Sequence, residues 1–292
     1  MKPLLILSFL ILSFSVHSQK LPVAWEELTA SDFVLAVKKS EGVCVIPMGV
    51  IEKHGAHLPL GTDVYIAREV SRRATEKEYC IVYPYYFMGQ IFEAKQQPGT
   101  IAYSHELLFK FLDETCQEIA RNGIKKIILA NYHGGNPDFL RFFCQSQLAK
   151  QKDYAVYLFT PSVDEKTEAK ILSLRKTDPD AGGHADEIES SEVMAIRPDL
   201  VKPERANNES GTDMNRLRLD NVYTGIWWYA KFPNHYAGDA KDANAALGEI
   251  ILEQEAKQLS EVIKAVKADQ ATLRLQNEFF KESLSPIETK LK

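Results

Sequence analysis

One stretch of the sequence joins an apolar run to side chains of the kinds that bind metals: Val43-Cys44-Val45-Ile46-Pro47-Met48-Gly49-Val50-Ile51-Glu52-Lys53-His54-Gly55-Ala56-His57-Leu58-Pro59-Leu60-Gly61-Thr62-Asp63. Residues 43–48 are short and near-continuously apolar, as a strand buried on both faces of a sheet should be. Residues i and i+2 of an extended chain project to the same side, so Glu52 and His54 can address one point. Gly61 lets the chain turn back and bring Asp63 toward that point. Imidazole nitrogen and carboxylate oxygen are ligands of zinc, manganese and iron, so the stretch predicts a strand followed by half of a metal site.

The same alternation continues along the chain and sets the fold class. Apolar runs at 79–83, 126–130 and 154–159 indicate further strands, and amphipathic segments at 63–77, 104–122 and 137–150 indicate helices between them. Strands that alternate with helices predict an α/β protein with a mostly parallel central sheet covered on both sides. We also predict a long helix over about 242–270, followed by a charged, peripheral tail.

The length favours one large domain. Because there is no repeat, low-complexity tract or linker, residues 19–292 are predicted to form a single domain. Residues 206–241 break the pattern, and a long irregular segment inside a domain is usually functional or disordered; its aromatics argue against disorder. Its Trp227, Trp228, Phe232 and His235 suit equally a cover over the site and a contact between subunits.

The amino-terminal residues have the pattern of a targeting segment. Lys2 precedes an apolar run over 4–16, and small residues at its end predict a secretory signal peptide, residues 1–18, cleaved before Gln19. The run is short for a membrane span, although a retained anchor is the alternative. We therefore expect an exported protein, secreted or periplasmic, with no stable membrane insertion after cleavage.

Composition excludes one class of partner. A net charge of −5 without a basic stripe argues against nucleic acid. Cys44, Cys80, Cys116 and Cys144 show no CxxC spacing and are expected to be buried free thiols.

A second polar segment, Asn131-Tyr132-His133-Gly134-Gly135-Asn136, comes directly after the strand predicted at 126–130. Sites in open α/β sheets assemble at the carboxyl ends of strands, so His133 can converge on the same crevice as His54. Asn136 suits either a cap on the following helix or a role in the site.

A third segment is Gly182-Gly183-His184-Ala185-Asp186-Glu187-Ile188-Glu189-Ser190-Ser191-Glu192. His184 and Glu187 are three residues apart and would share a face of a helix that began here. Acidic residues at a helix start are also common for electrostatic reasons alone, so this spacing by itself fits a solvated first turn as well.

Together these segments resemble the creatininase (creatinine amidohydrolase) family. The residues that match are Glu52-x-His54-Gly55-x-His57-Leu58-Pro59-Leu60-Gly61-Thr62-Asp63, Pro98-Gly99-Thr100, Asn131-x-His133-Gly134-Gly135-Asn136 and His184-Ala185-x-Glu187-x-Glu189-x-Ser191. The resemblance implies a three-layer α/β/α sandwich with two divalent metal ions per subunit, zinc, manganese or iron. It implies hydrolysis of a C–N bond in a small-molecule amide, commonly a cyclic one, by a homo-oligomer that is often a hexamer.

By position, the resemblance implies Glu52, His54, Asp63 and His133 as metal ligands, with Asp63 bridging the two ions. Creatinine-cleaving members have a further glutamate ligand where this chain has Gly135. Members with the His-Gly-Gly form carry instead a glutamate at the place of Glu187, which we therefore expect as the fifth ligand.

The remaining roles also follow from the resemblance. His184 corresponds to the catalytic histidine that carries a proton to the leaving nitrogen. Glu189 is expected to orient His184 or to act as an outer partner of the site. His57 is expected in a supporting role rather than as a ligand.

The substrate-side loop departs from the family pattern. Serine, histidine and phenylalanine of that pattern are replaced by Ile91, Ala94 and Gln97, which removes polar contacts and makes creatinine itself an unexpected substrate. One alternative is a deformylase or lactam hydrolase acting on a larger substrate. The other is a non-catalytic protein that keeps the fold and binds a metal or a sugar.

Overall fold

One parallel sheet forms the centre of the computed structural model, which describes residues 21–162 and 164–289. Its strands are β1 (Val43–Met48), β2 (Ile81–Val82), β3 (Lys126–Asn131) and β4 (Ala155–Phe159), in the spatial order β2-β1-β3-β4. Each predicted strand is present, and the parallel pairing confirms the α/β class. The expected signal peptide, residues 1–18, lies outside the described residues.

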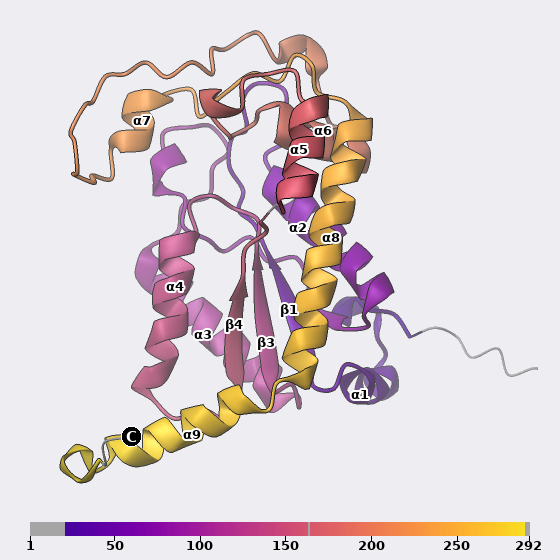
Figure 1. Ribbon diagram of the computed structural model, residues 1–292, viewed down its shortest axis with the longest axis vertical. Helices are drawn as coiled ribbons and strands as arrows, with labels where there is room; N and C mark the ends of the chain where they lie inside the picture. Colours follow the sequence, from indigo (N-terminus) through magenta and orange to yellow (C-terminus); the bar gives the residue numbers. More distant parts are fainter. Residues whose placement is uncertain (1–20, 163, 290–292) are drawn as a thin grey trace, which may run out of the picture.

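Helices cover both faces of this sheet (Figure 1). In the described ranges the α-helices are α1 (Ala30–Lys39), α2 (Thr62–Lys77), α3 (His105–Arg121), α4 (Pro137–Ser146), α5 (Glu165–Leu174), α6 (Glu187–Ile196), α7 (Trp227–Lys231), α8 (Ala245–Ala268) and α9 (Ala271–Ser283). Side chains cap several of them: Ser104 accepts a hydrogen bond from Leu107 N at the start of α3, and Asn244 accepts one from Leu247 N at the start of α8.

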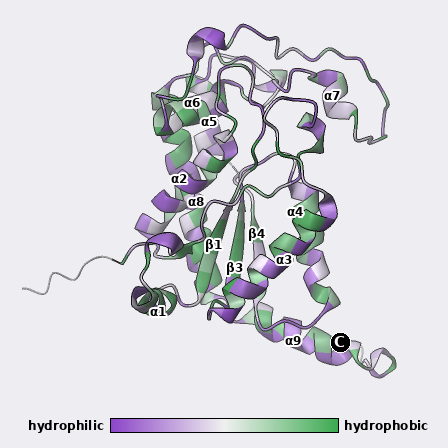
Figure 2. Cartoon of the chain, turned by 180° about the vertical axis from the view of Figure 1, so that it is seen from behind, coloured by the Kyte–Doolittle hydropathy of each residue, from purple (hydrophilic) through white to green (hydrophobic). Residues whose placement is uncertain are grey.

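Alternate residues of each strand enter two different cores, because successive side chains of a strand point to opposite faces. Val43 and Val45 of β1 pack with apolar residues of α2, α6 and α8, whereas Cys44 and Ile46 pack with α1, α3 and α4. This division explains why the interior of each strand is apolar, and Figure 2 shows β1 and β3 coloured mainly as hydrophobic. The three-layer α/β/α sandwich is confirmed.

The region after α8 differs from the expected peripheral tail, because it contains helix α9. Phe280 of this helix is buried, and Gln276 Nε2 donates to Tyr154 O at 3.0 Å. The helix nevertheless projects from the body of the fold below the sheet (Figure 1). The amphipathic pattern of residues 271–283 is short and lies in a charged part of the chain, so the sequence did not reveal this helix.

The irregular segment 206–241 lies above the carboxyl edge of the sheet and holds only the short helix α7 (Figure 1). The loops that follow β1 and β3 emerge at the same edge. None of the four cysteines, all within the described ranges, is bridged; Cys144 is partly exposed and the other three are buried. In residues 21–162 and 164–289, no helix combines the length and apolarity needed to cross a membrane.

Candidate metal centre

The loop after β1 and the start of α2 form one compact unit. Gly61 precedes α2, which places Asp63 in the first helical turn, where the helix dipole favours a carboxylate. Val50 N donates to Asp63 Oδ2 at 3.4 Å. Gly49 leaves room for this approach, since a Cβ there would lie 2.7 Å from the Asp63 backbone. The loop therefore brings Asp63 back beside Glu52 and His54, as the sequence predicts.

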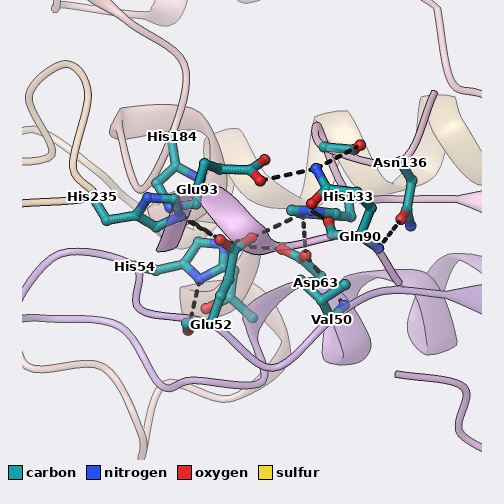
Figure 3. Close-up of polar contacts among 12 residues, drawn as sticks. Val50, Glu52, His54, Asp63, Gln90, Glu93, His133, Asn136, His184 and His235 are labelled. Atoms are coloured by element: carbon teal, nitrogen blue, oxygen red, sulfur yellow. Dashed lines mark hydrogen bonds and ion pairs between the residues drawn. The ribbon is translucent and has the colours of Figure 1, made fainter. Parts of the chain in front are cut away.

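A first group of possible ligands consists of Glu52, Asp63 and His133 (Figure 3). His133 Nδ1 lies 2.9 Å from Glu52 Oε1 and 3.0 Å from Asp63 Oδ2. The other ring nitrogen, Nε2, lies 2.8 Å from Gln90 O and donates to it. This hydrogen bond fixes the tautomer in which Nδ1 offers its lone pair to the group.

A second group consists of His54, Asp63 and Glu189. His54 Nε2 lies 2.9 Å from Asp63 Oδ1 and 3.7 Å from Glu189 Oε2. His54 Nδ1 donates to Glu52 O at 3.3 Å, so Nε2 is the nitrogen left to accept an ion. Because Oδ1 of Asp63 faces this group and Oδ2 faces the first, its carboxylate lies between the two.

Glu187 does not join this cluster, in contrast to its expected role as fifth ligand. Its carboxylate accepts from Lys176 N at 3.0 Å and from Thr177 N and Oγ1, each at 2.8 Å. The physical reason is the start of α6: Asp186 caps it through Ile188 N, and residues two apart on a helix point to nearly opposite sides. Glu187 therefore faces the 176–177 backbone, and Glu189 takes the place beside His54.

The turn before α6 positions His184 and Glu189 together. Ala185 adopts a left-handed φ of +58°, and its N–H donates to Glu189 Oε2 at 2.5 Å. His184 Nε2 donates to Lys53 O at 3.0 Å, which leaves Nδ1 unprotonated, 3.9 Å from Glu189 Oε2. The His184 and His54 rings lie 4.3 Å apart.

His57 supports this turn from behind and does not enter the ligand groups of the described residues. Its Nε2 lies 2.9 Å from Ser190 Oγ, and Ser190 Oγ donates to Ala185 O at 3.2 Å. The Ser190 hydroxyl proton is thus used, so His57 Nε2 is the donor in this pair. The supporting role expected for His57 agrees with this chain of hydrogen bonds.

His235 is a site residue that sequence reasoning placed only among possible covering aromatics. Its Nδ1 accepts from Trp228 Nε1 at 2.8 Å, so its Nε2 carries the proton and donates to Glu52 Oε2. Figure 3 shows its ring beside His184. His235 lies in the irregular segment, far along the chain from Glu52, and no spacing pattern could have linked the two.

The loop of residues 89–100 contributes Gln90, Phe92 and Glu93 to the cavity over the centre, but Ile91, Ala94 and Gln97 are not among the lining residues. Ile91 and Ala94 pack into a small core with Val50. Gln90 N instead donates to Asn136 Oδ1 at 2.9 Å. The Asn136 side chain makes no helix-capping bond and joins the two loops, so both of its expected roles are replaced by a structural one.

The charges of the site respond to one another strongly. Burial alone lowers the pKa of His54, but Asp63 outweighs it and raises that pKa to about 9. Burial also opposes charge on His133 and Glu52, yet their pairing raises the pKa of His133 and lowers that of Glu52, both well beyond their usual ranges. Burial raises the pKa of Glu189 to about 8. The ionised, buried carboxylates are stabilised by positive charge beside them. Protonated His54 and His133 supply this charge when no metal cation is bound.

The donor set fits divalent ions. Glu52 Oε1 and His54 Nε2 are buried and make no properly directed hydrogen bond, although oppositely charged atoms lie close by. Two imidazoles and three carboxylates, with Asp63 between two groups, form a nitrogen and oxygen set that zinc, manganese or iron accepts.

A cavity of about 680 Å³ opens onto this centre. Its walls combine aromatic side chains with acidic ones, among them Glu93, whose Oε2 accepts from Gln90 Nε2 at 2.9 Å. The lining includes Phe92, Glu93, His184, Tyr223, Trp227 and Trp228.

The fold and the site together define an α/β protein with a buried carboxylate–histidine centre at the carboxyl edge of a parallel sheet. The sequence model of the creatinine amidohydrolase family matches residues 26–263. The chain therefore belongs to the creatininase family and is an amidohydrolase of that family.

Known relatives act on different molecules. The chain is 26% identical to the creatinine amidohydrolase of Pseudomonas putida, over 78% of this chain and 90% of that protein. It is 25% identical to the 3-dehydro-scyllo-inosose hydrolase of Thermotoga maritima, over 56% and 52% of the two chains, and 31% identical to a mycofactocin precursor peptide peptidase of Mycobacterium tuberculosis, over 42% and 51%.

Solved structures share the fold. A manganese form of creatininase superposes with a TM-score of 0.71 at 22% identity, covering 85% of this chain and 99% of that one. A zinc form of a creatininase mutant gives a TM-score of 0.70 at 22% identity, with the same coverage.

Proposed function

We propose that this chain is an exported amidohydrolase that uses two divalent metal ions to hydrolyse a C–N bond of a small-molecule amide. The observation that carries the proposal is the position of Asp63, whose two oxygens lie 2.9 Å from His54 Nε2 and 3.0 Å from His133 Nδ1. One ion would be held by Glu52, Asp63 and His133, and the other by His54, Asp63 and Glu189. Family membership and the manganese and zinc forms of the structural relatives support it.

The ions would supply polarisation of the amide carbonyl and a lowered pKa of water at neutral pH. The chain's own residues provide the rest. His184 keeps Nδ1 unprotonated because Nε2 is used by Lys53 O, so Nδ1 can accept a proton and deliver it to the leaving nitrogen. Burial, together with His54, lowers the pKa of His184 to about 3, which favours the neutral ring in the resting site.

Metal content and hydrolysis test this proposal together. We expect two zinc, manganese or iron ions per purified chain, and loss of both in Asp63→Asn, because that residue contacts both groups. We expect wild-type protein to hydrolyse members of a panel of cyclic amides and formamides, and His184→Ala to lose most of that activity while keeping its ions. Fewer than one ion per wild-type chain would overturn the two-metal reading. Equal inactivity of wild type and His184→Ala across the panel would favour a binding protein that keeps the fold.

Export and assembly belong to the same proposal. Lys2 and the apolar run that follows support export, and cell fractionation with amino-terminal sequencing should find an exported chain beginning at Gln19. An intact amino terminus in the membrane fraction would show a retained anchor instead. The family resemblance supports a homo-oligomer, and light scattering at the column exit should give a multiple of the chain mass.

A further inference from the structure

A second cavity, of about 350 Å³, lies beside the metal centre. It shares His133, Gly134, Pro137, Gly183 and Glu189 with the larger cavity, so the two hollows meet at the cluster. Its other wall is formed where α6 and α8 cross. A molecule held at the cluster can therefore extend into the second cavity.

Three residues that line this cavity each carry a buried oxygen atom without a hydrogen-bond partner: Glu192 Oε1, Glu255 Oε2 and the hydroxyl oxygen of Tyr132. Glu192 is only 4% exposed. The three residues come from α6, from α8 and from the loop after β3, and each lines the same space. A buried polar atom without a partner costs free energy, so such a group in a native protein marks a missing ligand or water.

Among the described residues, the cavity offers no unpaired positive group to match its carboxylates, because His133 Nδ1 already lies 2.9 Å from Glu52 Oε1 and 3.0 Å from Asp63 Oδ2. Arg175 lines it, but its Nη2 is paired with Asp186 Oδ2 at 2.7 Å. Burial, and then the neighbouring Glu255, raises the pKa of Glu192 well above its usual range, and burial raises that of Glu255 to about 8. A cation bound between them would stabilise their ionised forms.

We propose that this cavity binds a primary ammonium group of the substrate, on Glu192, Glu255 and Tyr132, while the amide lies at the metal centre. An ammonium group has three N–H donors and no acceptor, and the three lining residues carry one unpartnered oxygen each. A calcium ion suits it less well, because calcium takes six to eight oxygen ligands. Neither Glu192 nor Glu255 belongs to a metal-binding group of the described residues.

This inference rests on the proposed amidohydrolase function and names its substrate class. The substrate is an amide that carries a primary amine within reach of its C–N bond, as ω-amino amides do. In this proposal Glu192 and Glu255 select the substrate, and they are not ligands of the metal centre.

Binding is measured first, by calorimetry on the full chain, with n-pentylamine, 1-pentanol and n-pentyltrimethylammonium as probes. The alcohol lacks the charge, and the quaternary cation lacks the N–H donors. We expect pentylamine to bind at least about tenfold more tightly than either probe. Glu192→Gln and Tyr132→Phe should each weaken it about tenfold, because the first removes a negative charge and the second removes a hydrogen-bond acceptor. Glu261→Gln, an exposed glutamate on α8, is the matched control and should bind as wild type does.

Chelated protein is titrated in parallel, since an amine can also bind a metal ion. Retained pentylamine binding after chelation supports the site. Equal binding of amine and alcohol, binding lost on chelation, or displacement of pentylamine by potassium or sodium chloride at matched ionic strength would overturn it, the last by showing an inorganic cation site.

Hydrolysis then separates this inference from the proposed function. We expect kcat/KM for 5-aminopentanamide to exceed that for hexanamide at least tenfold, and this ratio to fall toward one in Glu192→Gln but not in Glu261→Gln. Equal hydrolysis of the two amides would overturn the ammonium site and leave the amidohydrolase standing. Tight pentylamine binding without hydrolysis of any ω-amino amide would retain the ammonium site and count against the proposed function.

Discussion

Glu189 Oε2 lies 3.7 Å from His54 Nε2, so this glutamate closes the group of ligands on one side of Asp63. Its neighbour two residues earlier, Glu187, is turned away and accepts hydrogen bonds from the 176–177 backbone. The two carboxylates of this motif thus have different roles: Glu189 faces the centre, and Glu187 binds the backbone of the loop before α6.

The pair Glu189→Gln and Glu187→Gln tests this division. We predict that Glu189→Gln lowers metal content toward one ion per chain and abolishes most activity, with little change in the free energy of unfolding of the chelated protein. Glu187→Gln should keep both ions and lower the free energy of unfolding by about 1.5–3 kcal/mol, because a buried anionic acceptor is lost. Elemental analysis and urea denaturation measure the two effects. The reverse pattern would restore Glu187 as the ligand.

Gly135 provides a second test, because it has no space for a side chain. A Cβ there would lie 2.5 Å from Glu93 Oε1 and 2.6 Å from His133 Nε2. We predict that Gly135→Glu, which places a carboxylate where the family resemblance implies one in creatinine-cleaving members, does not rescue Glu189→Gln. It should instead displace His133 and lower the free energy of unfolding by about 1–3 kcal/mol through overpacking. Recovery of the second ion in the double variant would show that the two positions are interchangeable here.

The sequence predicts much of this arrangement from local patterns. Apolar runs mark all four strands, and because parallel strands end at one edge, the loops bearing Glu52 and His133 were expected to meet there. Glu52 and His54, two residues apart, also lie together in the structure, in a third group of possible ligands that they form with His184.

Other features depend on contacts that no pattern encodes. The choice between Glu187 and Glu189 is decided by where α6 begins, and a shift of two residues reverses the side each faces. His235 reaches Glu52 through an irregular segment, where neither period nor spacing carries information. Ile91 and Gln97 were expected on the substrate side; Ile91 is in a core, and Gln97 Nε2 donates to Pro233 O at 2.7 Å.

His57 makes stability depend on pH. Burial lowers its pKa to about 4, below the value of about 6.5 expected for an unfolded chain, so between these values the unfolded state binds more protons. The contribution of neutral His57 to the free energy of unfolding is therefore full above about pH 6.5 and is lost as the pH falls toward about 4. We predict that His57→Asn flattens this part of the stability curve, measured by urea denaturation of chelated protein from pH 7 to 4. Parallel curves for the two proteins would contradict the assignment.

Trp228 and His235 form a chain of hydrogen bonds that orients Glu52, a proposed metal ligand. Trp228 Nε1 donates to His235 Nδ1 at 2.8 Å, which keeps the proton on Nε2, and that proton is shared with Glu52 Oε2. Trp228→Phe keeps an aromatic ring against Phe232 and removes only the donor. His235 can then take the other tautomer, in which the lone pair of Nε2 faces Glu52 Oε2 and repels that carboxylate. We predict that metal affinity falls about 10- to 100-fold, the usual effect of losing an outer partner of a ligand.

Competition with a chelating dye measures this affinity. The control is Trp227→Phe, which alters the same cavity without touching the hydrogen bond of His235. If both variants bind metal as wild type does, the chain of hydrogen bonds has no part in holding the ions; if both lose affinity equally, the tryptophans act through packing and not through the donor.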